Sequence, residues 1–333
     1  MSVRIVSAEE VERLLPMAQA IDVMEDVFRT LARGDAVQPL RSMVWLPERR
    51  GLLGLMPAYL GAPSLLGLKA VTVMPGNHGT EFDSHQGVVL VFETTHGALR
   101  AVVDASAITA IRTAAVSGLA TRVLAREQAG DLALLGSGTQ ARTHLEAMRA
   151  VRKLRRVRVW SATPGHARVF AARESARPGL AIEAMETARA AVEGADLICT
   201  VTAAKSPVLK GEWIAEGAHV NAVGACFPSA RELDTAAVVR SRLIVDRRES
   251  TLAEAGDFLI PKEEGALDER HIRAELGEVL NGAAAGRESP ADVTLFKSLG
   301  LAVEDLAAAH HVATRASEMN VGLALDLGGR RRG

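Results

Sequence analysis

Apolar residues recur along the N-terminal part of the chain with the spacing of helices. After Pro16 they repeat every three or four residues and stop before Gly34, which predicts an amphipathic helix that faces the core. Just upstream, the hydroxyl of Ser7 and the carboxylate of Glu10 form a capping-box pattern, which predicts a first, shorter helix. The apolar positions of the longer helix are Ile21, Met24, Phe28 and Leu31.

From residue 36 to residue 104 the pattern changes to short apolar runs separated by Gly and Pro, and runs such as 67–73 and 87–92 predict strands. A long helix is predicted next, at about residues 107–125. Arg112 falls inside its apolar arc, since successive helix residues are about 100° apart. The arc consists of Ile108, Ile111, Val116, Leu119 and Val123.

The chain after residue 130 alternates between predicted strands and predicted helices. Such alternation is typical of an α/β fold with a parallel sheet and helices on its faces. A basic tail, Arg330 to Arg332, is expected to be a solvated end. The predicted strands are 131–135, 157–160, 180–185, 196–201, 218–223, 243–245 and 293–296, and the predicted helices are 139–151, 164–175 and 303–318.

A glycine-rich loop joins the first of these strands to the first of these helices. Gly136 permits a tight turn, Gly138 lets the backbone approach a pyrophosphate, and the small Ala141 allows the helix to pack closely on the strand. Thr139 and Gln140 open the helix, whose free N–H groups bind phosphates. A glycine pattern alone also fits an ordinary turn, but its place at the head of repeated strand and helix units predicts a dinucleotide site.

The end of the second strand of this region bears on the choice of nicotinamide cofactor. Sites for NAD usually carry an acid there that bonds the ribose hydroxyls, and here no acid occurs before Glu174. The hydroxyls of Ser161 and Thr163 are candidates to bind a 2′-phosphate, and Arg168 or His166 adds charge unless it lies on a wet helix face. NADPH is therefore expected, with NADH as the alternative.

Composition and charge narrow the class of protein. The chain has 333 residues, 48% of them hydrophobic, and its 39 Lys and Arg nearly balance 40 Asp and Glu, for a net charge of −1. This length fits two domains. The near balance of positive and negative charge argues against nucleic acid or a membrane surface as a partner. No secretion leader and no stretch near the roughly 20 apolar residues of a membrane span are evident.

Cysteine usage adds to this picture. Cys199 and Cys226 are too few for a disulfide framework or a Cys-built zinc site, so no metal is expected, and they fit a reducing compartment. A cytoplasmic location follows by default. Cys199 lies in an apolar strand run and is expected to be a small buried hydrophobe.

Two cations fall at positions that the pattern predicts to be buried. Arg112 lies in the apolar arc of its helix, and Lys69 lies in a strand run of Gly, Leu, Ala and Val. An unpaired buried charge costs several kcal/mol, so each needs an anionic partner. From spacing alone, that partner is either an Asp or Glu of the chain or an anion that the protein binds. Arg122 also lies at the edge of the arc, but it is near the helix end and can extend to water.

A series of segments resembles the ornithine cyclodeaminase and mu-crystallin family of nicotinamide-dependent enzymes. The segments span residues 38–306 in order, and the Arg-Thr-Ala-Ala run at 112–115 together with Glu-Leu-Asp at 232–234 is specific to the family. The matching segments are 38–41, 55–59, 67–69, 75–77, 84–87, 108–115, 136–141, 221–225, 231–234, 254–257 and 296–301.

The resemblance implies a homodimer with a composite fold. A Rossmann-type domain, residues 116–302, is inserted in an α+β substrate and dimerisation domain, residues 1–115 plus 303–333. A small imino or amino acid is then the substrate, and cations matching Arg41, Lys69 and Arg112 hold its carboxylate, which would be the anion that the buried cations require. By the same resemblance, the residues near the cofactor are Ser84, His85, Arg112, Thr200, Thr202, Val223, Gly224 and Ser298.

One position departs from the cyclodeaminase pattern. Where those enzymes carry an acid that exchanges protons with the substrate amine, this chain has Cys226, and the lysine four residues later is Ala230. A neutral thiol does not act as a carboxylate base, so ring closure of ornithine is not expected. The segments 224–228 and 84–86 resemble the mu-crystallin and ketimine reductase branch instead. Cys226 either helps to place the imine nitrogen or fills space.

The sequence therefore predicts NAD(P)H-dependent reduction of a cyclic ketimine carboxylate, Δ1-pyrroline-2-carboxylate or Δ1-piperideine-2-carboxylate, to L-proline or L-pipecolate. A protonated iminium is already electrophilic, so hydride transfer to it requires little acid–base chemistry of the protein. Three alternatives remain. They are reductive amination of a 2-oxo acid as in alanine dehydrogenase, cyclodeamination with Glu232, Asp234 or Glu254 as the acid, and a non-catalytic NADPH-dependent binding protein like mu-crystallin.

Overall fold

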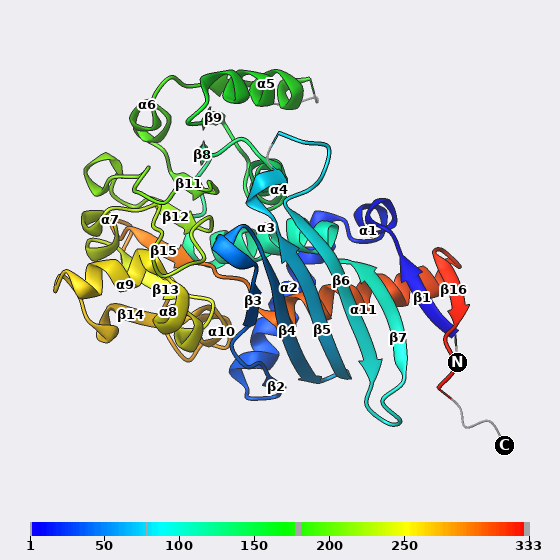
Figure 1. Ribbon diagram of the computed structural model, residues 1–333. Helices are drawn as coiled ribbons and strands as arrows, with labels where there is room; N and C mark the ends of the chain where they lie inside the picture. Colours follow the sequence, from blue (N-terminus) through cyan, green and yellow to red (C-terminus); the bar gives the residue numbers. More distant parts are fainter. Residues whose placement is uncertain (1, 78, 177–180, 330–333) are drawn as a thin grey trace. The chain divides into compact units, whose positions relative to one another are not determined.

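The computed structural model describes residues 2–77, 79–176 and 181–329, and the chain divides into two compact units (Figure 1). Unit 1 comprises Met1–Arg112 and Gly300–Gly333, and unit 2 comprises Thr113–Leu299. Each unit contains one eight-stranded sheet. The roles predicted above for the substrate and dinucleotide domains stay predictions.

The sheet of unit 1 joins strands from both ends of the chain. Its strands are β1 (Ser2–Val6), β2 (Ala36–Val37), β3 (Ser42–Trp45), β4 (Leu52–Gly61), β5 (Ser64–Val73), β6 (His85–Glu93), β7 (Leu99–Asp104) and β16 (Leu323–Asp326). They follow the order β16-β1-β7-β6-β5-β4-β2, with β3 paired to β4, and all pairs except β1 with β7 are antiparallel. The predicted strand runs are confirmed within β5 and β6.

Helices cover one face of this sheet (Figure 1). They are α1 (Ala8–Leu14), α2 (Met17–Ala32) and α11 (Ala302–Glu318), and α11 packs on β4 to β7 with α2 beside it. The predicted capping box is confirmed, since the Ser7 N–H donates to the Glu10 carboxylate at 2.8 Å. Short 3-10 turns are present at Pro47–Arg49 and Pro75–Asn77.

The sheet of unit 2 is entirely parallel and confirms the predicted α/β fold. Its strands are β8 (Asp131–Leu135), β9 (Arg156–Trp160), β10 (Ile182–Ala184), β11 (Leu197–Thr200), β12 (His219–Ala222), β13 (Arg242–Val245), β14 (Ile272–Glu275) and β15 (Thr294–Lys297). Their order, β10-β9-β8-β11-β12-β15-β13-β14, changes direction between β8 and β11. In open α/β sheets, ligands bind outside the carboxyl ends of the strands at such a switch point.

The helices of unit 2 include those predicted after the glycine loop. They are α4 (Thr139–Val151), α5 (Pro164–Ser175), α6 (Ala188–Val192), α7 (Thr235–Val239), α8 (Arg248–Glu254), α9 (Gly256–Glu263) and α10 (Leu276–Leu280), with 3-10 turns at Gly211–Trp213 and Glu269–His271. The start of the strand predicted at 180–185 and the basic tail at 330–332 lie outside the described residues. No sequence pattern predicts β14 or the helices α6 to α10.

The long helix α3 (Ala105–Leu124) corrects two expectations. It is buried on every side from Ile111 to Thr121, so the apolar arc predicted for it was too narrow, and Val123 at its end is only half-buried. By length and composition alone, α3 is also apolar enough to cross a membrane, contrary to the expectation that no stretch comes near. Of its apolar window, 83% is buried inside the protein, which identifies α3 as a core helix.

Candidate active site

Two of the predicted site residues, Lys69 and Arg112, are buried cations of unit 1. Lys69 lies on the inward row of β5 with Leu65 and Val71, because side chains of a strand alternate between the two faces of a sheet. It is 3% exposed, and Arg112 on α3 is 5% exposed. The prediction that both are buried is confirmed.

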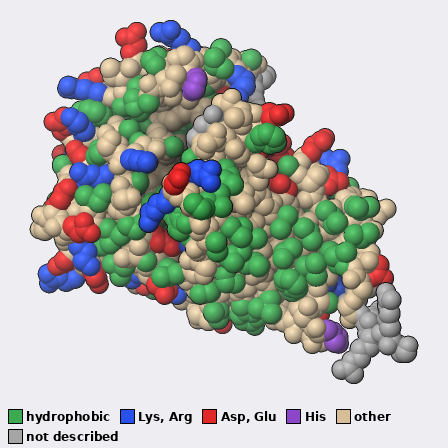
Figure 2. Space-filling model, viewed as in Figure 1, with side chains coloured by type: hydrophobic (Ala, Val, Ile, Leu, Met, Phe, Trp, Pro, Cys, Tyr) green, Lys and Arg blue, Asp and Glu red, His purple; other side chains and the backbone are tan. Residues whose placement is uncertain are grey.

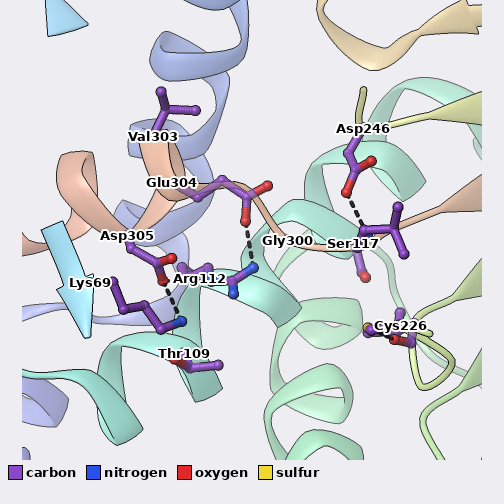
Figure 3. A network of polar contacts seen from close by, with 12 residues as sticks. Lys69, Thr109, Arg112, Ser117, Cys226, Asp246, Gly300, Val303, Glu304 and Asp305 are labelled. Atoms are coloured by element: carbon purple, nitrogen blue, oxygen red, sulfur yellow. Dashed lines mark hydrogen bonds and ion pairs between the residues drawn. The ribbon is translucent and has the colours of Figure 1, made fainter. Parts of the chain in front are cut away.

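Both cations contact acids at the start of α11. The Lys69 Nζ and the Arg112 Nε each donate to Asp305 Oδ1 at 3.0 Å, and the Arg112 Nη1 donates to Glu304 Oε2 at 2.7 Å (Figure 3). Both acids are fully buried and lie in the first turn of α11, where the helix dipole favours negative charge. Of the two partners that spacing left open, an acid of the chain is therefore present for each cation.

Arg41 completes this group of cations. It is half-buried, and its Nη2 donates to the carbonyl oxygen of Gly300 at 3.1 Å. Gly300 has a φ of +80°, and a Cβ there would lie 2.3 Å from Arg112 Nη1, so only glycine lets the chain pass this close to the guanidinium. The structure thus brings together the three cations predicted to hold a carboxylate.

The five charged side chains named here carry more positive than negative formal charge. Three cations, Arg41, Lys69 and Arg112, face two carboxylates, Glu304 and Asp305, for a formal sum of +1. Burial lowers the pKa of Lys69 to about 8; Asp305 opposes this shift, and the positive charges of Arg112 and Arg41 add to it. Although burial disfavours its charged form, Arg112 has a raised pKa because Asp305 and Glu304 lie beside it. The arrangement favours the arrival of one further anion.

The glycine loop of unit 2 has the geometry of a phosphate site. Gly136 has a φ of +123°, and a Cβ there would lie 2.7 Å from the carbonyl oxygen of Val201, whereas a Cβ on Gly138 would meet nothing within 4 Å. Gly138 is the N-cap of α4, and no side chain caps that helix. The N-terminus of α4 is therefore available to an anion, and Ala141 beneath it is fully buried as predicted.

Two further predicted cofactor residues carry polar atoms that the fold leaves unsatisfied. Among the described residues, the Oε1 of Gln140 and the Oγ of Ser298 are buried without a hydrogen-bond partner. Buried polar atoms of this kind are uncommon and often mark a ligand contact or an ordered water. Together with the open space at Gly138, they show that these residues fit a polar group such as a dinucleotide.

The end of β9 carries hydroxyls and no acid. Ser161 is half-buried, Thr163 is exposed, and Thr163 is the N-cap of α5 without a side-chain cap bond. His166 and Arg168 are exposed in the first turns of α5. Glu174 is buried at the far end of that helix, where it pairs with an arginine at 2.9 Å. Residues 161–168, all of them described, contain no Asp or Glu.

The remaining predicted residues divide between the units. In unit 1, the Ser84 Oγ and the His85 Nδ1 lie 3.0 Å apart, and His85 is exposed at the start of β6. In unit 2, Thr200, Thr202, Val223 and Gly224 lie at or just after the carboxyl ends of β11 and β12. Their predicted contact with the cofactor stays a prediction.

The two cysteines differ in environment. Cys199 is fully buried on β11, as predicted, and burial raises the pKa of its thiol to about 12. Cys226 is half-buried, and its Sγ lies 3.4 Å from the carbonyl oxygen of Val223, to which it donates. Cys199 is therefore an inert core residue, while Cys226 retains some exposure.

Sequence reasoning missed several buried charged residues. They include Glu304 and Asp305 in unit 1, and Asp257 and Lys297 in unit 2, while Glu232 was considered only as a substitute acid for cyclodeamination. A signal was present for Lys297, which lies in an apolar strand run as Lys69 does. The acids carry no comparable local signal, because each lies in a polar or mixed segment of the sequence.

Comparison with known proteins identifies a family whose model matches this chain. The model of the ornithine cyclodeaminase/mu-crystallin family matches residues 1–320. The ketimine reductase mu-crystallin of Mus musculus is 41% identical over 307 residues, which cover 91% of this chain and 94% of that protein.

Two solved structures are similar throughout. The Δ1-pyrroline-2-carboxylate reductase of Thermococcus litoralis, in complex with NADH and L-proline, has a TM-score of 0.94 and 39% identity, covering 96% of this chain and 99% of that chain. An archaeal alanine dehydrogenase dimer with bound NAD has a TM-score of 0.93 and 32% identity, covering 98% and 100%.

Proposed function

This chain belongs to the ornithine cyclodeaminase/mu-crystallin family, and from that premise we propose that it is an NAD(P)H-dependent oxidoreductase acting on a C=N bond. Its substrate is a cyclic ketimine carboxylate, Δ1-pyrroline-2-carboxylate or Δ1-piperideine-2-carboxylate, and its product is L-proline or L-pipecolate. The observation that carries the proposal is the cluster of three cations in unit 1, since Lys69 and Arg112 share Asp305 and Arg41 bonds the carbonyl oxygen of Gly300 just before α11.

The cluster binds and orients the substrate carboxylate. Asp305 and Glu304 accept hydrogen bonds from the Nε and Nη1 of Arg112 and so hold its guanidinium in place, where its permanent positive charge attracts a carboxylate. Lys69 is fixed by Asp305 on the same side of the sheet. Because these side chains are already ordered, binding costs little further side-chain entropy, and the imine carbon is presented in one orientation.

Unit 2 holds the cofactor, which supplies the hydride when bound. Gly136 and Gly138 leave room for the pyrophosphate at the N-terminus of α4, and Gln140 and Ser298 offer their unsatisfied polar atoms. Absence of an acid at the end of β9 supports NADPH over NADH.

The structure argues against cyclodeamination with a substitute acid. Glu232 is fully buried, and both of its carboxylate oxygens accept hydrogen bonds within the protein. Asp234 caps α7 through the Ala237 N–H at 2.8 Å and also accepts from Gly211 at 2.9 Å. Glu254 is buried at the end of α8. Glu232 and Asp234 thus each have a structural role.

A homodimer is supported by the uncovered face of the unit 1 sheet. Figure 2 shows hydrophobic side chains gathered over this face. Val44 lies opposite Leu53 across β3 and β4, and these outward side chains are 60% and 37% exposed. Val37 and Leu66, at 61% and 46%, form a second row, because they lie on either side of Tyr59 across β2, β4 and β5. A continuous apolar surface of this kind marks a protein interface, which a second copy would bury.

The location proposed for the enzyme is the cytoplasm, because neither Cys199 nor Cys226 forms a disulfide. Sedimentation equilibrium tests the dimer. A Leu53→Glu variant is expected to shift the protein toward monomer, whereas an unchanged dimer would place the interface elsewhere.

A cofactor-oxidation assay tests the reaction. The two ketimines are compared with pyruvate plus ammonia, each with NADPH and with NADH. We expect a ketimine to be turned over fastest and NADPH to be preferred. Faster turnover of pyruvate would favour alanine dehydrogenase, and ammonia release from ornithine without net cofactor oxidation would favour a cyclodeaminase. Tight NADPH binding with no reduction of any substrate would favour a binding protein.

A further inference from the structure

Glu232 is a buried carboxylate of unit 2 that no step of the proposed reaction uses. It is 0% exposed and precedes α7. Its Oε1 accepts from the Thr202 N–H at 2.7 Å and from the Thr202 hydroxyl at 2.6 Å. Its Oε2 accepts from the Gly224 N–H at 2.7 Å and from the Thr200 hydroxyl at 2.8 Å. All four donors lie at or just beyond the carboxyl ends of β11 and β12.

The arrangement of donors requires two acceptor oxygens. Hydroxyls rotate and can either donate or accept, but the backbone N–H groups of Thr202 and Gly224 only donate. These two N–H groups point to different oxygens of Glu232. An amide in place of the carboxylate has a single oxygen, so whichever way it turns it leaves one backbone N–H facing an NH2 group. Only a carboxylate satisfies both strand ends.

Asp257 and Lys297 extend the same network. Asp257 Oδ1 accepts from the backbone N–H groups of Glu232 and Leu233 at 2.8 and 3.0 Å. Lys297 Nζ donates to Asp257 Oδ2 at 2.8 Å and to the carbonyl oxygen of Ala225 at 2.7 Å. Burial and the nearby Asp257 raise the pKa of Glu232, while its bond with Thr202 and the charge of Lys297 oppose that shift. The network ties the ends of β11, β12 and β15 together.

Close packing rules out direct contact between Glu232 and a substrate. A Cβ on Gly224 would lie 2.1 Å from the Thr202 carbonyl oxygen and 2.6 Å from Glu232 Oε1. The two strand ends therefore pass each other at the distance that only a glycine allows, and the carboxylate fills the space behind them. Glu232 can influence a ligand only through the backbone that it holds.

We infer that Glu232 is a positioning residue, which fixes the strand ends at Thr202 and Gly224 in the conformation that receives the nicotinamide cofactor. The inference rests on the proposed function. It follows from where these ends lie: β11 adjoins β8 at the point where the strand order changes direction, and the ligand crevice of an α/β sheet forms outside the carboxyl ends there. A buried carboxylate that satisfies both ends keeps that edge rigid before any ligand arrives.

The test is a Glu232→Gln variant of the full chain, followed by two readouts on protein without substrate. NADPH fluorescence titration is expected to give a Kd about tenfold or more above wild type, as loss of a charge-assisted hydrogen bond implies. Hydrogen exchange is expected to accelerate at the Thr202 and Gly224 amides. In steady-state kinetics, KM for the cofactor should rise more than KM for the ketimine.

Glu174→Gln is the matched control. Glu174 is as buried, in the same unit, and lies at the far end of α5. It should lose stability without a change in NADPH affinity. If Glu232→Gln does not fold, Thr202→Val and Thr202→Ser decide the question, because only the second keeps the hydroxyl bonded to Glu232. We expect valine to raise the Kd and serine to restore it.

The outcomes separate the two proposals. A wild-type protein that binds neither nicotinamide cofactor would overturn the proposed function and this inference with it. Wild-type binding together with a folded Glu232→Gln protein whose Kd lies within twofold of wild type would overturn the inference alone. Equal affinities for the valine and serine variants at Thr202 would do the same.

Discussion

Each unit of this protein contains a buried lysine paired with an aspartate, and the two pairs behave in opposite ways. Lys69 lies 3.0 Å from Asp305 in unit 1, and Lys297 lies 2.8 Å from Asp257 in unit 2. The pKa of Lys69 falls to about 8 because burial and two neighbouring arginines outweigh Asp305. Burial also opposes the charge on Lys297, but Asp257 and further acidic groups raise its pKa. The surroundings of each pair, rather than the aspartate alone, decide whether the pKa of the lysine falls or rises.

The difference distinguishes a binding cluster from a structural one. In unit 1, three cations against two carboxylates sum to +1. In unit 2, Lys297 against Asp257 and Glu232 sums to −1, and the extra negative charge is spread over four hydrogen-bond donors on Glu232. The extra positive charge of the unit 1 cluster favours the binding of a carboxylate. The Glu232 carboxylate of unit 2 already accepts hydrogen bonds from four donors and needs no ligand.

Replacing Arg112 by methionine should give the largest effect on activity. Removing the guanidinium lowers the formal sum of the unit 1 cluster from +1 to 0 and leaves Glu304 without its 2.7 Å partner. Truncating one partner of a buried charge pair costs about 2–5 kcal/mol of binding free energy, so kcat/KM for the ketimine should fall by roughly 10²- to 10³-fold in the cofactor-oxidation assay.

Arg112→Lys is the companion variant, because it keeps the charge but loses the planar fork. It should recover part of the activity. Thermal melting of both variants checks that the fold persists. Activity of the methionine variant within tenfold of wild type would remove the unit 1 cluster from substrate binding and would end the contrast between the two units.

Replacing Lys297 by methionine should mainly affect stability. Without the ammonium, Asp257 and Glu232 remain buried with a formal sum of −2, and the cost of about 3–5 kcal/mol should lower the melting temperature by roughly 10 °C. Lys69→Met should lower it less, because Asp305 keeps its 3.0 Å bond to Arg112. Differential scanning calorimetry of the two variants makes the comparison, and equal losses would contradict it.

Local patterns in the sequence predicted the elements of this fold better than its charge pairs. The strand and helix alternation after residue 130 was readable because a change of hydrophobic period is a local signal. The burial of Lys69 and Arg112 followed from their apolar neighbours. Their partners did not, because Asp305 is 236 residues from Lys69 and 193 from Arg112, and nothing in a local pattern links such positions.

Other parts of the site needed the family resemblance or the structure. Arg41 lies outside the regular elements, so no periodicity singled it out. The role of Glu232 depends on which backbone N–H groups point at it, and that geometry exists only once β11 and β12 lie side by side. Sequence patterns give the burial of a charge, and the fold alone gives the balance of charges around it.

The pH dependence of activity tests the same contrast between the two units, and its expected effect on kcat/KM is smaller than that of the substitutions above. Lys69 is positively charged below its pKa of about 8 and neutral above it, so the cation surplus of unit 1 disappears as the pH rises through 8. We expect kcat/KM for the ketimine to be level below that pH and to fall by about tenfold per pH unit above it, apart from the titration of the imine itself.

Lys69→Arg separates the two contributions, because an arginine keeps its charge across this range. Any fall that remains in this variant belongs to the substrate, and the difference between the two profiles belongs to Lys69. Profiles that coincide over pH 6–10 would show that the charge of Lys69 does not bind the carboxylate.

Replacing Cys226 by alanine should give the smallest effect. The thiol donates to the Val223 carbonyl oxygen at 3.4 Å, and a thiol is a weak donor. Loss of one weak, half-exposed contact should change kcat/KM by less than about threefold, and Cys226→Ser should match it, as the same ketimine assay measures. A fall of more than about thirtyfold in the alanine variant, restored by serine, would make Cys226 part of the chemistry. A serine hydroxyl can replace a thiol as a hydrogen-bond donor and acceptor. Rescue by serine would therefore mean that unit 2 contributes a hydrogen bond from position 226 to the reaction, in addition to its structural cluster.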